Sequence, residues 1–120
     1  MKKYLALAPL LLFAAAPAHA TGGLICRTGG AKPIEVSLGF GHVPGAPLIA
    51  TRLLDHGRPV PVSAAQWWLD NAEVRVLLIG PNASKEELLL RAKRNHARHF
   101  FDGSLLRNGK RRWVRCRDDG

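Results

Sequence analysis

The sequence has few cysteines and few carboxylates, and these shortages limit the chemistry that it can perform. Only two of the 120 residues are cysteine, and they form no Cys-x-x-Cys pair, so a cysteine metal pair has no support. The nine carboxylates are outnumbered two to one by basic residues, and no Gly-x-Ser-x-Gly motif occurs. We therefore expect no catalytic residues, no cofactor and no metal ion, even though His96 and His99 have a spacing that can hold a metal on a helix.

Long apolar runs are also missing after residue 20, where no stretch approaches the roughly 18 residues of a spanning helix. The uncharged run from Leu5 to Ala16 follows two lysines and precedes the small-x-small sequence Ala18-His19-Ala20. This layout is typical of a secretory signal peptide. We expect residues 1–20 to be the signal peptide and residues 21–120 to be one domain, periplasmic or secreted, without a transmembrane segment.

Acidic residues are the scarcer charge, and the formal net charge is +9. Removal of the signal peptide with Lys2 and Lys3 leaves 16 basic and 9 acidic residues, a net charge of +7. This balance favours an anionic partner such as an envelope polymer or a lipid surface, and export argues against nucleic acid. Solubility alone is the alternative explanation of the charge.

The two cysteines, Cys26 and Cys116, lie near the two ends of the expected domain. An even count in an exported chain predicts a disulfide. In the chain-entropy model, a bridge across such a long loop contributes roughly 4 to 5 kcal/mol. A disulfide that ties the first strand to the last is therefore expected.

Short stretches in which apolar and polar residues alternate predict strands over 34–40, 48–54 and 74–79. Asn108-Gly109 is the dipeptide favoured in a two-residue hairpin turn. Folding the chain at that turn sets Phe101 opposite Cys116 and Asp102 opposite Arg115. These features predict a mainly β fold, a small antiparallel sandwich or barrel closed by one disulfide.

Residues 85–98 carry two competing signals. Ser84 and Glu87 fit a capping box, and helix formers follow them. Leu88, Leu90 and Ala92 also occupy every second position, with Leu89 and Arg91 between them, which is the spacing of a strand. Strands are expected before and after this segment as well. We favour a strand with a turn near Asn95, and a helix remains the alternative.

The candidate binding residues are basic and aromatic. On the predicted hairpin Arg111, Trp113, Arg115 and Arg117 share one face, where guanidinium groups suit phosphate and carboxylate. Trp67 and Trp68 form a second candidate, because neighbours on a strand point to opposite faces and one of them tends to be exposed. The alternatives are a solvated basic strand and tryptophans used for packing.

The segment Phe101-Asp102-Gly103-Ser104-Leu105, together with Gly109, Val114 and Cys116, resembles the closing hairpin of small exported proteobacterial β domains. It is more loosely similar to the periplasmic barrels of lysozyme-inhibitor type. The resemblance implies a barrel-like architecture.

Charge, export and the hairpin together predict a non-catalytic periplasmic binding or accessory protein for an anionic cell-envelope component. One alternative is a protein-interaction module, such as an inhibitor of lysozyme or of an envelope enzyme. A small envelope hydrolase is the second alternative. The sequence leaves the oligomeric state open.

Overall fold

The computed structural model describes residues 22–41 and 48–118, and the expected signal peptide lies outside them. The elements in chain order are β1 (Gly22–Thr28), β2 (Ile34–Phe40), β3 (Leu48–Asp55), β4 (Arg58–Val60), β5 (Ser63–Leu69), β6 (Glu73–Ile79), a 3-10 turn η3 (Pro81–Ala83), β7 (Glu86–Asn95), β8 (Phe100–Arg107) and β9 (Lys110–Asp118). The strands predicted over 34–40, 48–54 and 74–79 correspond to β2, β3 and β6.

All of these strands belong to one antiparallel sheet in the order β4-β3-β2-β1-β9-β8-β7-β6-β5. The sheet consists of two meanders, β1 to β4 and β5 to β9, which are joined by the pairing of β1 with β9. The prediction of a mainly β, disulfide-closed fold is confirmed, and the sheet curls into a half-barrel.

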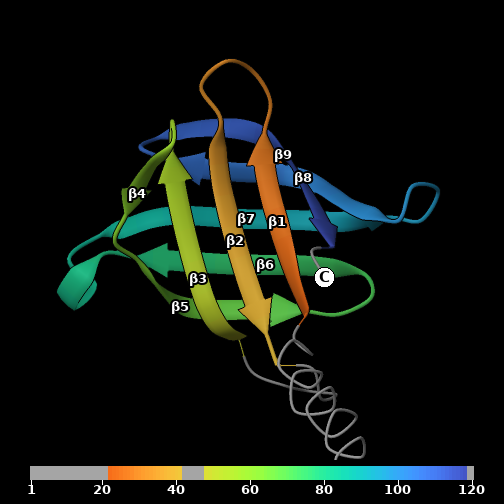
Figure 1. Ribbon diagram of the computed structural model, residues 1–120, viewed down its shortest axis with the longest axis horizontal. Coiled ribbons are helices and arrows are strands. Elements are labelled where there is room, and N and C mark those ends of the chain that lie inside the picture. Colours follow the sequence, from red (N-terminus) through yellow and green to blue (C-terminus); the bar gives the residue numbers. More distant parts are fainter. Residues whose placement is uncertain (1–21, 42–47, 119–120) are drawn as a thin grey trace, which may run out of the picture.

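Figure 1 shows β1, β2 and β3 crossing in front of β5, β6 and β7 at a steep angle. Curling of one sheet thus produces two layers, as in orthogonal sheet packing. The core lies between the layers, and its inward side chains alternate with outward ones along each strand. Its fully buried large members are Val36, Leu38, Leu53, Val74, Val76, Leu78, Leu88, Leu90, Phe101, Leu105 and Val114.

Strand β7 resolves the competing signals in residues 85–98 in favour of a strand. Leu88, Leu90 and Ala92 are buried, while Leu89 and Arg91 between them are exposed. The strand pairs with β6 on one side and β8 on the other, so its backbone hydrogen bonds are made within the sheet. Tertiary pairing outweighs the helix propensity of these residues.

The hairpin of β8 and β9 has the predicted register. Phe101 lies opposite Cys116 and Asp102 opposite Arg115, and Asn108 and Gly109 form the turn with φ values of 51° and 77°. Positive φ at both central residues is the requirement of a type I′ turn, which Asn-Gly meets at low cost.

The disulfide between Cys26 and Cys116 joins the two meanders. The two residues face each other directly in the register of β1 and β9, with a Cα–Cα distance of 3.9 Å. Both are fully buried in the core. A structural disulfide of this kind is typical of proteins in an oxidising compartment.

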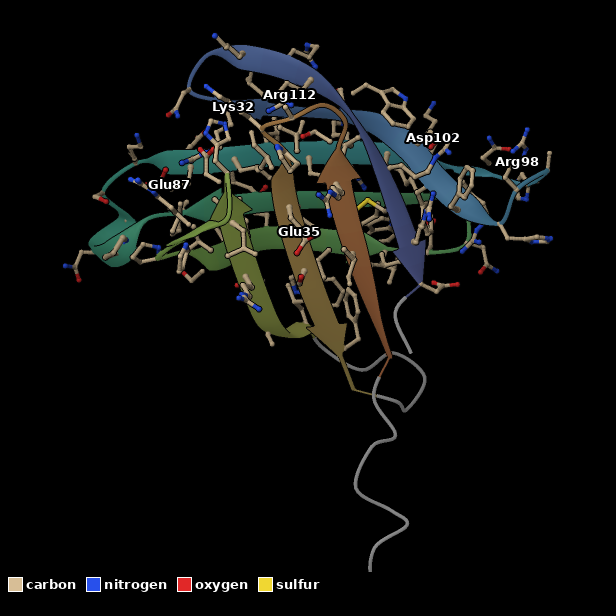
Figure 2. All side chains as sticks on the ribbon, turned by 45° about the horizontal axis from the view of Figure 1, so that its top comes forward. Lys32, Glu35, Glu87, Arg98, Asp102 and Arg112 are labelled. Carbon is tan, nitrogen blue, oxygen red and sulfur yellow. A yellow bond between two sulfur atoms is a disulfide. The ribbon has the colours of Figure 1, made fainter. Side chains whose placement is uncertain are left out.

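Ion pairs close one end of the half-barrel. The partly buried Arg107 guanidinium donates to Asp55 Oδ2 at 2.7 Å and to Glu87 Oε1 at 2.9 Å. Burial alone lowers the pKa of Arg107, but its bonds to Asp55 and Glu87 outweigh burial and raise it above the ordinary value. Nearby, Arg112 donates to the Lys32 carbonyl oxygen at 3.0 Å, and Figure 2 shows the two residues side by side. The bond from Arg112 secures the loop between β1 and β2, and the bonds of Arg107 secure the end of β8.

Candidate functional site

The most distinctive surface of the molecule is the side of β5 to β9 that points away from the core, called here the outer face. Side chains on adjacent strands of a sheet lie next to one another when their residues are paired. The outer face therefore brings together residues from strands that are distant in the sequence.

One line of paired residues crosses this face from β5 to β9. Trp68 pairs with Arg75, Arg75 with Arg91, Arg91 with Ser104, and Ser104 with Trp113. We call this line the Trp–Arg row. With neighbouring strands about 4.8 Å apart, its two tryptophans are separated by about 19 Å along the sheet.

Both ends of the Trp–Arg row are exposed aromatic rings. Trp68 is 50% exposed and Trp113 is 54% exposed. The indole Nε1 of Trp68 donates to Asp70 Oδ2 at 2.9 Å, which fixes the orientation of the ring. Backbone N–H groups of Ala72 and Glu73, and then the Trp68 indole, lower the pKa of Asp70, so its carboxylate remains ionised at neutral pH.

Two arginines face each other in the middle of the row. Arg75 pairs with Glu73 through Nε and Oε1 at 2.9 Å, and its guanidinium lies 5.5 Å from the Trp68 ring centre. Arg91 stands directly opposite Arg75 and has no carboxylate within 4.0 Å among the residues that the structure describes. Like charges in direct cross-strand opposition are unfavourable. Glu73 offsets part of this repulsion, and an anion beside Arg91, which has no such partner, would offset the rest.

The β9 residues predicted from the sequence all belong to the outer face, but they differ in availability. Arg111 is exposed and donates to Ser104 Oγ at 3.2 Å, which places its guanidinium beside the Trp–Arg row. Arg117 is exposed and lies 5.9 Å from the Phe100 ring centre. Both retain N–H groups that can bind an anion.

Arg115 is occupied by a contact within the protein. Its Nε donates to Asp102 Oδ1 at 2.7 Å, and its guanidinium stacks 3.7 Å from the Phe100 ring centre. The Arg115 hydrogen bond holds the pKa of Asp102 below its ordinary value, against the effect of burial. Arg115 thus stiffens the hairpin and positions its neighbours on β9.

Trp67 points to the other side of β5 and does not join the row. It pairs with the inward residue Val76, and its ring centre lies 5.5 Å from that of Phe40. The ring is 39% exposed because β5 is an edge strand of the sheet. Of the two adjacent tryptophans, the structure therefore brings Trp68, and not Trp67, together with the β9 residues.

Sequence reasoning identified both ends of the row and missed its centre. Arg75, Arg91 and Ser104 were not predicted as site residues. The alternation of apolar and polar residues nevertheless placed the two arginines on the side of their strands that points away from the core. Joining them to Trp113 requires the registers of β6, β7 and β8. The β6–β7 register includes a shift at Leu78/Ile79, which the sequence does not reveal.

The space around the row is an open hollow and no enclosed cavity. A depression of about 430 Å³ has Trp68, Leu89, Arg75 and Arg91 in its lining, and Trp67 contributes to it as well. Within the described ranges 22–41 and 48–118, no three His, Cys, Asp or Glu side chains lie close enough to hold a metal ion. Such a shallow, basic and aromatic surface suits the binding of an extended or flat anionic partner.

Comparisons with known proteins add no functional assignment. Over residues 22–41 and 48–118, no helix has the length and hydropathy needed to cross a bilayer. No protein-family model, no curated protein and no solved structure matches the chain.

Proposed function

We propose that the protein is a non-catalytic periplasmic binding or accessory protein for an anionic component of the cell envelope. The observation that carries this proposal is the Trp–Arg row, in which two facing arginines lie between two exposed tryptophans. Guanidinium groups bind phosphate and carboxylate through paired N–H donors, and the rings add apolar contact area.

The distribution of charge on the outer face supports the same function. Glu73 and Asp102 on this face are already paired with Arg75 and Arg115, and the Asp70 carboxylate accepts hydrogen bonds from the Trp68 indole and from two backbone N–H groups. The remaining cations on this face are exposed and make no ion pair within the described part of the chain: Arg91, Lys93, Arg111 and Arg117. This excess of positive charge attracts an anionic partner over a distance set by the salt concentration.

Retention of the protein on envelope material tests the proposal. The oxidised protein, produced from the full chain, is applied to peptidoglycan sacculi, lipopolysaccharide and anionic vesicles across a salt series. We expect retention at low salt on at least one of these materials and steep loss as salt rises. The triple variant Arg91→Gln, Arg111→Gln and Arg117→Gln should lose most of this retention.

A matched variant distinguishes the effect of the outer-face cations from the effect of net charge alone. Arg52→Gln, Arg58→Gln and Lys85→Gln remove three exposed cations from β3, β4 and the segment before β7. Since these residues lie away from the Trp–Arg row, retention should fall only slightly. Equal losses in the two triple variants, or no retention of the unmodified protein at low salt, would contradict the proposed site.

A further inference from the structure

The exposed apolar side chains of the protein gather on the same face as the unpaired cations. Four large apolar side chains are exposed in the described part of the chain: Trp67, Trp68, Leu89 and Trp113. Three of them belong to the outer face, and only Trp67 does not. Isolated exposed apolar residues are ordinary on a protein surface, whereas a cluster on one face indicates a contact site.

Leu89 occupies the centre of this cluster. It is 40% exposed on the middle strand β7, and it pairs with Leu77 of β6 and Leu106 of β8. These three leucines form an apolar row next to the Trp–Arg row. The two ends of this leucine row pair with Gln66 of β5 and Arg111 of β9, and Trp68 and Trp113 lie on these same two strands in the adjacent Trp–Arg row. Apolar side chains are therefore present on all five strands of the outer face.

We infer that the anionic component is a lipid surface and that the outer face lies flat against it. This inference rests on the proposed function and names its partner. Leu89 would enter the boundary between headgroups and acyl chains, with Trp68 and Trp113 at the level of the headgroups, where tryptophan is enriched. Arg91 and Arg111 would reach the lipid phosphates, since long basic side chains extend their charged ends toward the polar layer.

The apolar centre favours a lipid surface over a soluble acidic polymer. A polymer of carboxylates or phosphates binds through charge and gains nothing from Leu89 between the cations. A bilayer offers an apolar layer beneath an anionic one, and the outer face presents the same two kinds of group.

Vesicle binding with tryptophan fluorescence tests this inference. The oxidised protein is mixed with vesicles of phosphatidylcholine alone or with equal parts of phosphatidylglycerol, and with soluble polygalacturonate as the polymer probe. We expect binding to the anionic vesicles, a blue shift of the tryptophan emission, and quenching by brominated acyl chains. Binding that is confined to polygalacturonate would overturn the lipid inference and leave the proposed function standing, whereas binding to neither probe would overturn both.

Two leucine variants distinguish apolar insertion from charge. Leu89→Gln should weaken binding to anionic vesicles on the order of tenfold, as expected for burial of one leucine, and leave polygalacturonate binding unchanged. Leu54→Gln, on the half-buried outward side of β3, should leave vesicle binding unchanged. Unchanged vesicle binding by Leu89→Gln would overturn the inference.

Discussion

Asp102 and Arg115 show how a single contact on the outer face couples folding to pH. The hydrogen bond from Arg115 lowers the pKa of Asp102 in the folded protein. Folding thus favours the ionised carboxyl, and this stabilisation is present above the ordinary pKa of about 4. It is lost as pH falls through the lower folded pKa.

Asp102→Asn should therefore change the pH dependence of stability. At neutral pH the variant should be less stable by about 1 kcal/mol, because the amide pairs weakly with Arg115. The difference should shrink as pH falls below about 4, where the carboxyl takes up a proton in the unfolded chain, and should vanish below the lower pKa that Asp102 has in the folded protein. Urea unfolding at a series of pH values measures it, with the exposed Asp118→Asn as a control that removes the same charge. A difference that persists undiminished in acid would contradict the assignment.

Among the elements, β8 depends on a glycine where it approaches β7. A Cβ built on Gly103 would overlap the Arg91 carbonyl oxygen and lie 2.5 Å from Ala92 Cα. The obstacle is backbone of the neighbouring strand, which cannot move aside as a flexible side chain can. Glycine at a close approach of this kind often marks a tight bend in a curled sheet.

Gly103→Ala should destabilise the protein by about 1–3 kcal/mol, the usual range for overpacking. Chemical denaturation measures the change. Gly22→Ala in β1 is the matched control, because a Cβ at that position has nothing within 4 Å. We expect the control to stay within about 0.5 kcal/mol of the unmodified protein. Equal stability of Gly103→Ala would show that the two strands can separate freely at this point.

Local sequence signals predicted single strands and hairpins better than they predicted which strands pair to form the complete sheet. The Asn108-Gly109 turn determines both the register and the faces of its hairpin, so Trp113 could be placed from the sequence. Nothing local indicates that Arg91 stands opposite Arg75, since the pairing of β6 and β7 depends on the chain between them. That chain contains η3, where Asn82 adopts positive φ without a glycine signal.

At the scale of the whole molecule, the disulfide stabilises the one ladder that connects the two meanders of the described sheet. Cys26 and Cys116 are 90 residues apart in sequence, so their bond restricts a large part of the unfolded chain. The pairing of these cysteines was predictable from their number and positions. The curling of a single sheet into a half-barrel was not, because no sequence signal distinguishes it from a sandwich.

The double variant Cys26→Ala, Cys116→Ala should lose about 4 kcal/mol of unfolding free energy, the value of the chain-entropy model for so long a loop. Urea unfolding with and without reductant measures the loss. Reductant should weaken the unmodified protein by a similar amount and leave the variant unaffected. A variant as stable as the oxidised protein would mean that the β1–β9 ladder holds without its covalent bond.

The pairing of β1 with β9 also determines when the chain can finish folding. The contacts between these strands have almost the greatest sequence separation that the described chain allows, and such contacts form slowly because they close a long loop. The β1–β4 meander can form its hairpins as soon as its own residues are free, but β1 keeps an unpaired edge until β9 arrives. For a chain delivered from its N-terminus, the complete sheet therefore becomes available only after the final strand has emerged.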